Sequence, residues 1–192
     1  MFSPVVVSLF ATLAAAAPTA LTHRGVGTTF NLLFAASGQM IPDSVAALKT
    51  GIWAVASHNN HAVLLPREDA SLFYEYGSSR SVGTASTGIV ITPGGTSTVP
   101  SGAPIELINN NATAGVAVYN NDEGVPILHY DGGRFQACAG EDEIFLSFIA
   151  AGQRQLADCA VVELIAACSG AGQGSEMVGQ LGQPIEVSCN PN

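Results

Sequence analysis

The chain has 192 residues, of which 47% are hydrophobic and only 11% are charged, against about 25% charged residues in an average soluble domain. Its formal net charge at pH 7 is −9, and its six basic residues are scattered rather than clustered. This balance excludes nucleic acid as an expected partner, because binding to phosphates relies on clustered Lys and Arg. An anionic membrane surface would repel the chain as well.

The N-terminal segment has the pattern of a secretory signal peptide. In residues 1–17 a short N-terminal region precedes an apolar run from Val5 to Leu13, and small residues follow the run. The run is too short for a stable membrane span, which needs ~20 residues. We therefore expect a secreted protein without a membrane anchor. We expect residues 18–27 to be a flexible N-terminus or short pro-segment, and residues 28–192 to be one disulfide-stapled β-domain.

The mature region is a succession of short runs rich in β-branched and aromatic residues, separated by Gly, Pro, Asn and Asp. A strand and a turn every ~8–12 residues are typical of an all-β sandwich or barrel. We therefore predict a single antiparallel β-sandwich or closed barrel, with a β-trefoil as the alternative. Strands are expected at residues 28–36, 51–57, 61–65, 71–76, 88–92, 105–108, 114–119, 125–130, 134–138, 143–149, 160–166 and 185–188.

Two turns and one helix can be assigned from local patterns. The Asn pair within His58–His61 predicts a hairpin turn, because Asn tolerates positive φ. Asp131–Gly133 also permits positive φ, and predicts a hairpin between residues 125–130 and 134–138. At most one short helix is expected besides the leader. It would lie within Ile41–Thr50, where capping residues precede and Gly follows a short apolar run.

Four cysteines occur, and none precedes Cys138. An even number in an exported chain implies two disulfides, and four cysteines allow three connectivities. The sequence alone does not choose among them. We favour Cys138–Cys159 and Cys168–Cys189, which would close two consecutive loops and contribute about 3 kcal/mol each. A zinc site is not expected, because no Cys-x-x-Cys pair is present.

Other chemistry-bearing residues are interpreted as solvated surface groups. The two histidines of His58–His61 lack a third metal ligand in any recognisable pattern, so we expect an exposed turn. Glycoside hydrolysis needs two carboxyl groups about 5–10 Å apart across one cleft. The sequence does not bring Asp122–Glu123 and Glu141–Glu143 together, so both are interpreted as loop charges. No catalytic residue, cofactor or metal is therefore expected, and an enzymatic role is disfavoured rather than excluded.

Aromatic side chains could form a platform for sugar rings, although aromatic residues in strands more often belong to a core. The candidates are Trp53, Phe73, Tyr74, Tyr76, Tyr119 and Tyr130. From these we select Trp53, Tyr74 and Tyr76, together with Glu141 and Glu143, as a candidate ligand surface.

Asn111-Ala112-Thr113 is an N-glycosylation sequon within an Asn-rich turn. In an exported eukaryotic protein we expect Asn111 to carry a glycan.

Residues 51–77 and 134–166 carry a family resemblance. In the second stretch a strand from Phe135 to Cys138 precedes an acidic turn and an apolar strand, and Cys159 opens the last strand. This arrangement resembles small secreted fungal cell-wall proteins of the phialide-associated (PhiA-like) type and related secreted fungal β-domains. The resemblance implies secretion, association with the wall and an all-β domain. It implies no catalytic residues, and the chain departs from the pattern after Cys168.

Three functional hypotheses follow. The favoured one is a non-enzymatic secreted fungal protein of the cell wall or outer surface. The second is a carbohydrate-binding or carbohydrate-active domain whose partner is a wall polysaccharide. The third is a secreted effector or antigen that binds a host protein. The sequence leaves the ligand and the oligomeric state open.

Overall fold

A computed structural model of the chain describes residues 25–36, 40–92, 102–170 and 181–191. The expected signal peptide at residues 1–17 lies outside these ranges. The structure is 52% strand and 7% helical, which confirms the predicted all-β class. Among the described residues, no helix has the length and apolar character needed to cross a bilayer.

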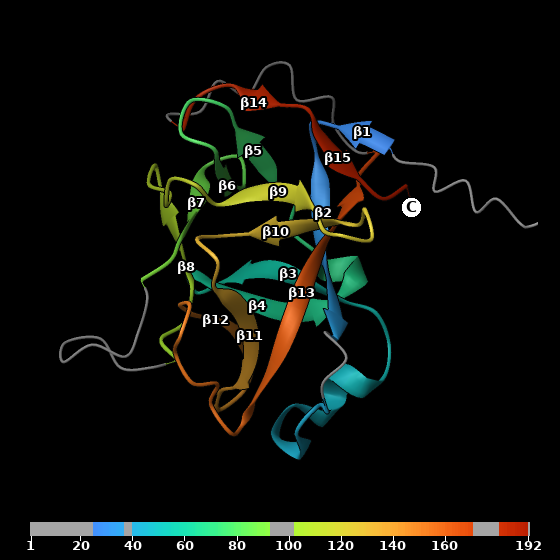
Figure 1. The fold of residues 1–192 in the computed structure, drawn as a ribbon, viewed down its shortest axis with the longest axis vertical. Helices are drawn as coiled ribbons and strands as arrows, with labels where there is room; N and C mark the ends of the chain where they lie inside the picture. Colours follow the sequence, from blue (N-terminus) through green and yellow to red (C-terminus); the bar gives the residue numbers. More distant parts are fainter. Residues whose placement is uncertain (1–24, 37–39, 93–101, 171–180, 192) are drawn as a thin grey trace, which may run out of the picture.

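Six antiparallel strands close into a barrel (Figure 1). The order around the barrel is β12-β11-β13-β2-β3-β4, and pairing between β4 and β12 closes it. Three strands come from the N-terminal half and three from the C-terminal half, without a threefold repeat. Of the expected architectures, the closed barrel is therefore the one observed. The strands are β2 (Phe30–Ala36), β3 (Trp53–His58), β4 (His61–Pro66), β11 (Arg134–Ala139), β12 (Ile144–Ile149) and β13 (Cys159–Cys168).

Further strands extend the sheet from two points of the barrel and add a separate two-stranded sheet. From β4 the sheet continues through β8, β7, β6, β5 and β14, while β10 joins β13 and carries β9. The extensions are β5 (Tyr74–Tyr76), β6 (Ser81–Gly83), β7 (Thr87–Val90), β8 (Glu106–Asn109), β9 (Ala117–Asn120), β10 (Pro126–His129) and β14 (Pro184–Ile185). The separate sheet pairs β1 (Gly25–Gly27) with β15 (Val187–Cys189).

The sequence patterns located most strands but misjudged three. β6 was not predicted, and the single strand expected at residues 185–188 is divided between β14 and β15. β1 was also missed, because its residues were assigned to a flexible segment. Each residue of β1 pairs with one of β15, so Gly25–Gly27 form part of a sheet. Very short strands carry too few side chains to show an alternating pattern.

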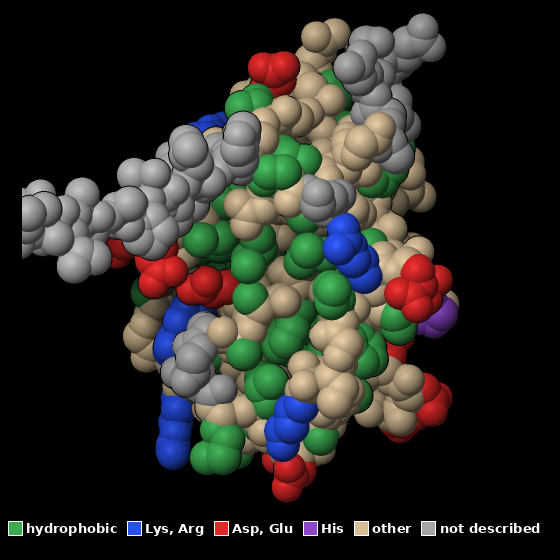
Figure 2. All heavy atoms as spheres, turned by 90° about the vertical axis from the view of Figure 1, so that its right-hand side faces the viewer, with side chains coloured by type: hydrophobic (Ala, Val, Ile, Leu, Met, Phe, Trp, Pro, Cys, Tyr) green, Lys and Arg blue, Asp and Glu red, His purple; other side chains and the backbone are tan. Residues whose placement is uncertain are grey.

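The core fills the barrel because alternate residues of each strand point inward. Phe30, Leu32, Leu64, Leu146 and Leu164 are almost completely buried and belong to one hydrophobic cluster. Each such side chain contributes about 1.5–3 kcal/mol relative to an exposed position. Figure 2 shows that hydrophobic side chains also reach the surface on one face, with most charged side chains around its margin.

The β3–β4 hairpin has the predicted turn. Asn59 and Asn60 both have positive φ, at 50° and 63°, as a two-residue type I′ turn requires. His58 and His61 pair directly opposite each other at the ends of the two strands. The Asn pair therefore sets the register of this hairpin.

The hairpin predicted across Asp131–Gly133 is wrong. The turn itself forms, and the Gly133 amide donates to the Tyr130 carbonyl at 3.0 Å. However, β10 and β11 do not pair with each other within the described residues, because both pair with β13 on successive segments. The ten-residue strand β13 is long enough to serve both. β10 and β11 are both antiparallel to β13, so they run in the same direction and the turn between them does not reverse the chain.

The short helix expected within Ile41–Thr50 is present as the 3₁₀ helix η1 (Asp43–Lys49). Its ends are joined by an exposed ion pair between Lys49 Nζ and Asp43 Oδ1 at 3.1 Å. A second 3₁₀ segment, η2 (Arg67–Asp69), is a three-residue turn after β4 that was not predicted.

Both favoured disulfides are present, Cys138–Cys159 and Cys168–Cys189. The first joins two directly opposed residues of β11 and β13 within the barrel. The second ties the end of β13 to β15, and thereby holds the sheet that contains β1. Two disulfides in one domain are typical of proteins that fold in an oxidising, extracellular environment.

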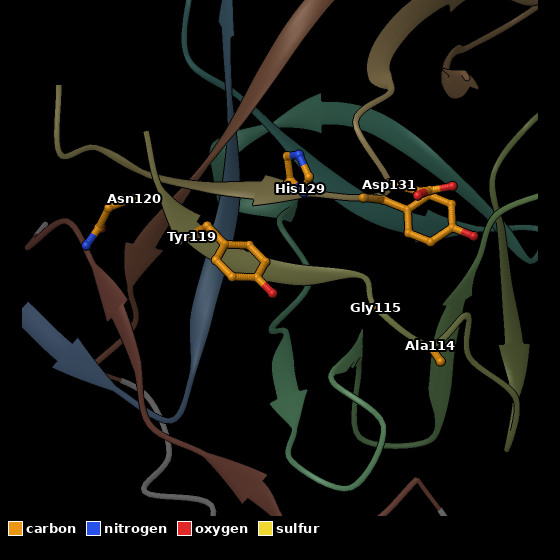
Figure 3. Close-up of a pocket in the computed structure, with 7 residues that line it drawn as sticks. Ala114, Gly115, Tyr119, Asn120, His129 and Asp131 are labelled. Carbon is orange, nitrogen blue, oxygen red and sulfur yellow. The ribbon is translucent and has the colours of Figure 1, made fainter. Parts of the chain in front are cut away.

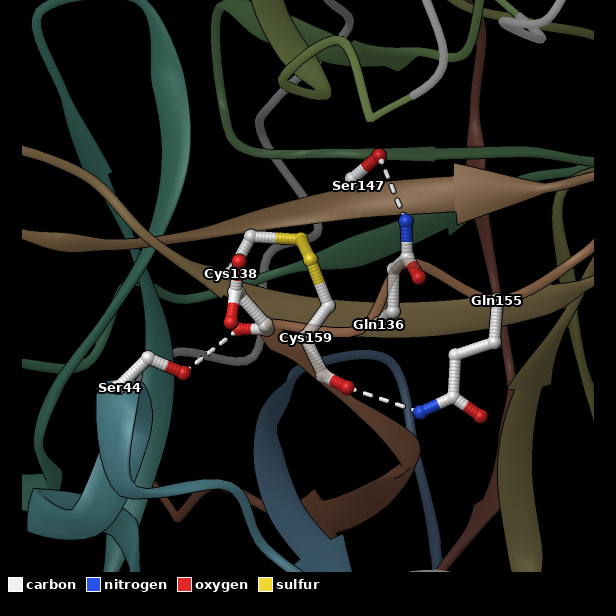
Figure 4. Close-up of a disulfide and its surroundings, with 7 residues drawn as sticks. Ser44, Gln136, Cys138, Ser147, Gln155 and Cys159 are labelled. Carbon is white, nitrogen blue, oxygen red and sulfur yellow. Dashed lines mark hydrogen bonds between the residues drawn. A yellow bond between two sulfur atoms is a disulfide. The ribbon is translucent and has the colours of Figure 1, made fainter.

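Hydrogen bonds anchor the segments around the first disulfide (Figure 4). Ser44 Oγ of η1 donates to the Asp158 carbonyl at 2.8 Å, and Gln155 Nε2 donates to the Cys159 carbonyl at 2.8 Å. Gln136 Nε2 donates to Ser147 Oγ at 3.5 Å across the β11–β12 pair. The disulfide is thus embedded in a network that links η1 to the barrel.

Candidate functional site

The structure does not assemble the ligand surface expected from the sequence. Tyr74 and Tyr76 of β5 are only 5% and 0% exposed, so neither ring can stack on a ligand, and their assignment to a surface was wrong. Both lie in a strand flanked by β6 and β14, where neighbouring elements cover them. The Tyr76 hydroxyl donates to the Thr84 carbonyl at 2.6 Å. Burial, and secondarily the neighbouring Tyr74, raises the pKa of Tyr76 above its usual 10.0.

The other three expected ligand residues lie on different elements. Trp53 is partly buried against the core, and its indole nitrogen donates to the Thr50 carbonyl at 2.7 Å. Glu141 is exposed in the β11–β12 turn. Glu143 from the same turn lies beside the β3–β4 hairpin, with Oε2 3.9 Å from His58 Nε2. These side chains contribute to local packing and surface charge.

An open groove of about 690 Å³ lies instead over the β9–β10 hairpin (Figure 3). It follows the hairpin from its turn to its open end, because Asn120 lies at the end of β9 and Asp131 just beyond the end of β10. Tyr119 and His129 lie between these two ends (Figure 3). The lining residues are Ala114, Gly115, Tyr119, Asn120, His129, Tyr130 and Asp131.

Strand alternation explains why this groove is lined by an aromatic and an imidazole ring. Val118 and Leu128 are opposed in the β9–β10 ladder, and both are buried in the core. Their neighbours Tyr119 and His129 must therefore point outward. The two rings meet edge to face, with centroids 5.8 Å apart and planes at 86°. Tyr119 is 44% exposed, so much of its surface faces the groove.

An ion pair between the buried Glu75 and the half-exposed Arg80 supports Tyr119. Glu75 of β5 is 0% exposed, and its Oε1 lies 3.0 Å from Arg80 Nη2 and 3.1 Å from Arg80 Nε. Its Oε2 accepts the Val118 amide at 2.8 Å. The Arg80 guanidinium in turn lies 4.5 Å from the centre of the Tyr119 ring, a cation–π contact. Glu75 therefore holds both the strand that carries Tyr119 and the cation against its ring.

A second hollow of about 240 Å³ adjoins the groove and shares His129 with it. It lies where β10 and β11 follow one another along β13, and Ile127 and Phe135 contribute apolar surface to it. Arg134 and Glu163 add one charge of each sign. The two hollows therefore meet at His129, which lines both.

The remaining titratable clusters do not form a metal site. Among the described residues, no group of three or more His, Cys, Asp and Glu side chains could hold a metal ion. Asp122 and Glu123 are exposed in the β9–β10 turn, where the backbone amide of Glu123 donates to Asn121 Oδ1 at 3.1 Å. This turn and the Glu141–Glu143 turn belong to different hairpins.

The sequon lies on the surface next to β8. Asn111 is exposed, and the preceding Asn110 has a φ of 56°. The Thr113 hydroxyl accepts the Ile91 amide at 2.9 Å, and the Thr113 amide donates to the Ile89 carbonyl at 2.9 Å. The sequon backbone is thereby fixed while the Asn111 side chain faces solvent, so a glycan would not displace the core.

The sequence analysis identified some residues of the groove but missed the Glu75–Arg80 pair that supports Tyr119. Tyr119 and Tyr130 were among the six candidate aromatic residues, but neither was selected. His129 could have been found from strand alternation next to Leu128. Glu75 and Arg80 belong to a different strand and turn, and no local pattern links them to Tyr119. Comparison of the chain with protein-family models, curated proteins and solved structures gave no match.

Proposed function

We propose that this chain is a non-enzymatic protein that a fungal cell exports and keeps in its wall or at its outer surface. The two disulfides carry this proposal, because such bonds persist in oxidising compartments and are rare in the cytosol. The leader pattern in residues 1–17 and the exposed Asn111 support the same compartment. The low charged fraction and the resemblance to wall proteins support retention outside the cell.

A non-enzymatic role is supported by where the carboxylates lie. Hydrolysis of a glycosidic bond needs two carboxyl groups across one cleft. Among the residues that line the described groove, Asp131 is the single carboxylate. Binding and structural roles need no second carboxylate, so the groove fits them better.

Expression of the full chain in a fungal host tests this proposal. We expect the protein in the medium or in wall extracts, with an N-terminus produced by cleavage near residue 17. Asn111→Gln should lower its mass by one N-linked glycan while export continues. A control with Val6→Asp and Val7→Asp, which breaks the apolar run of the leader, should stay inside the cell. Wild-type protein that remains intracellular and starts at Met1 would refute the proposal.

A further inference from the structure

We infer that the groove over the β9–β10 hairpin, with the adjoining hollow around His129, is a binding site for an uncharged polysaccharide chain. This inference deepens the proposed function by naming the ligand class that a wall protein would meet. The binding itself is a property of the folded domain and does not depend on the route of export.

The shape of the surface suits an extended ligand. The groove has a volume of about 690 Å³, within the ~300–1,000 Å³ range of ligand sites. It is open along the hairpin, and the 240 Å³ hollow shares His129 with it. A polymer can lie in such an open path, whereas a small ligand would favour an enclosed cavity that covers most of its surface.

Tyr119 provides a platform whose orientation is fixed before a ligand arrives. A pyranose ring has apolar faces of C–H groups and a rim of hydroxyls, so it can stack on an aromatic ring while its rim stays available for hydrogen bonds. Arg80 and His129 both contact the Tyr119 ring, and Glu75 holds Arg80 in place. A side chain that is already ordered loses little conformational entropy on binding.

The polar groups around this platform match hydroxyl groups. A sugar hydroxyl both donates and accepts, so it pairs best with a mixture of donors and acceptors. Asp131 offers carboxylate acceptors, Asn120 offers an amide donor and an amide acceptor, and His129 offers its two ring nitrogens. The three residues are distributed along the groove rather than gathered at one point (Figure 3).

The charges favour a neutral chain over an ionic one. The charge of Arg80 is balanced by Glu75, and the lining of the adjoining hollow holds one charge of each sign, Arg134 and Glu163. A polyanion would also be repelled by the net charge of −9. For a polycation, Asp131 is the single carboxylate among the residues that line the groove. A neutral glycan requires no further counter-charge.

Titration calorimetry with the purified, disulfide-intact protein tests the inference. The probes are neutral hexasaccharides of β-1,3-glucan and of chitin, the cationic oligosaccharide of fully deacetylated chitin, and anionic oligogalacturonate. We expect binding of at least one neutral hexasaccharide, and at least about tenfold weaker binding of both charged ones. Tyr119→Ala should weaken binding about tenfold or more, a loss of about 1.4 kcal/mol or more, because it removes the aromatic ring on which the sugar stacks.

Matched variants separate a site from a general effect. Tyr119→Phe keeps the ring and should stay within about threefold of wild type, and Asp131→Asn should weaken binding severalfold. Ile185→Ala and Asp142→Asn alter exposed residues outside the groove and should bind like wild type. Thermal midpoints of all variants verify that they are folded.

Several outcomes would overturn the inference. These are no binding of either neutral hexasaccharide, preferential binding of a charged one, or unchanged binding by Tyr119→Ala. A protein partner whose binding depends on Tyr119, without any glycan binding, would also overturn it. None of these results bears on export, so failure here is distinct from failure of the proposed function.

Discussion

The Glu75–Arg80 ion pair offers the sharpest test of how the groove is supported. Glu75 is completely buried, and it accepts hydrogen bonds from Arg80 through one oxygen and from the Val118 amide through the other. In Glu75→Gln the side chain keeps its shape but retains a single acceptor oxygen. Either Arg80 or the Val118 amide then faces the new NH₂ group, so one donor loses its acceptor.

The magnitude follows from the bonds that are lost. A hydrogen bond to a charged group contributes about 1.5–3 kcal/mol, and Arg80 can recover part of its share from water because its side chain is 47% exposed. We therefore expect Glu75→Gln to lower the free energy of unfolding by about 2 kcal/mol. Arg80→Gln should lower the free energy of unfolding further, by up to about 3–5 kcal/mol, because it leaves the buried Glu75 carboxylate without its charged partner.

These changes in the free energy of unfolding are measured by urea unfolding of the disulfide-intact protein. The fluorescence of the single tryptophan reports the transition. The double variant Glu75→Gln, Arg80→Gln completes a cycle, and we expect a coupling energy of at least about 1 kcal/mol. Tyr119→Phe, which keeps the ring over Arg80, serves as a control and should stay within about 0.5 kcal/mol of wild type. If Glu75→Gln changes stability by less than about 0.5 kcal/mol, or the two substitutions are additive, the pair does not support the groove as described.

Three further predictions address other parts of the fold. The raised pKa of Tyr76 means that the unfolded chain loses this proton first, so stability should fall as the pH rises above 10.0. In Tyr76→Phe the free energy of unfolding, measured with urea, should fall less steeply as the pH rises. An unchanged pH dependence would contradict the raised pKa of Tyr76. Replacing Cys168 and Cys189 by Ser should lower the free energy of unfolding by about 3 kcal/mol. It should also abolish hydrogen-exchange protection in β1, because the partner of β1 is β15. Protection of β1 that survives would show that the disulfide does not hold this sheet. Gly133→Ala should lower stability by about 1–3 kcal/mol in thermal unfolding, because an added Cβ would meet both the Phe148 ring and the Ile149 carbonyl oxygen. A neutral effect would mean that both move aside freely.

Local patterns were sufficient wherever neighbours in the chain are also neighbours in the fold. The positive φ tolerated by Asn59 and Asn60 determined the β3–β4 hairpin, since both strands adjoin the turn. The equal lengths of two consecutive loops led to the favoured cysteine pairing. The register of β11 with β13 explains the first disulfide, because Cys138 lies directly opposite Cys159.

Prediction failed where the deciding contact came from a distant strand. The alternation in residues 71–76 indicated a strand but not that Tyr74 and Tyr76 would be covered by neighbouring elements. The Asp131–Gly133 turn indicated a hairpin, whereas β10 and β11 run in the same direction and both pair with β13.

The amino-acid sequence by itself determined the all-β class and most strand positions, and it favoured one of the three cysteine pairings without deciding it. These properties follow from side-chain alternation, turn residues and spacing, which act over a few residues or can be counted along the chain. Only the tertiary structure decided that the barrel is closed by β4 and β12, and that Glu75, Arg80 and Tyr119 form one unit. Pairing partners and ion pairs depend on which distant segments share a sheet, and no local preference of the chain specifies that choice.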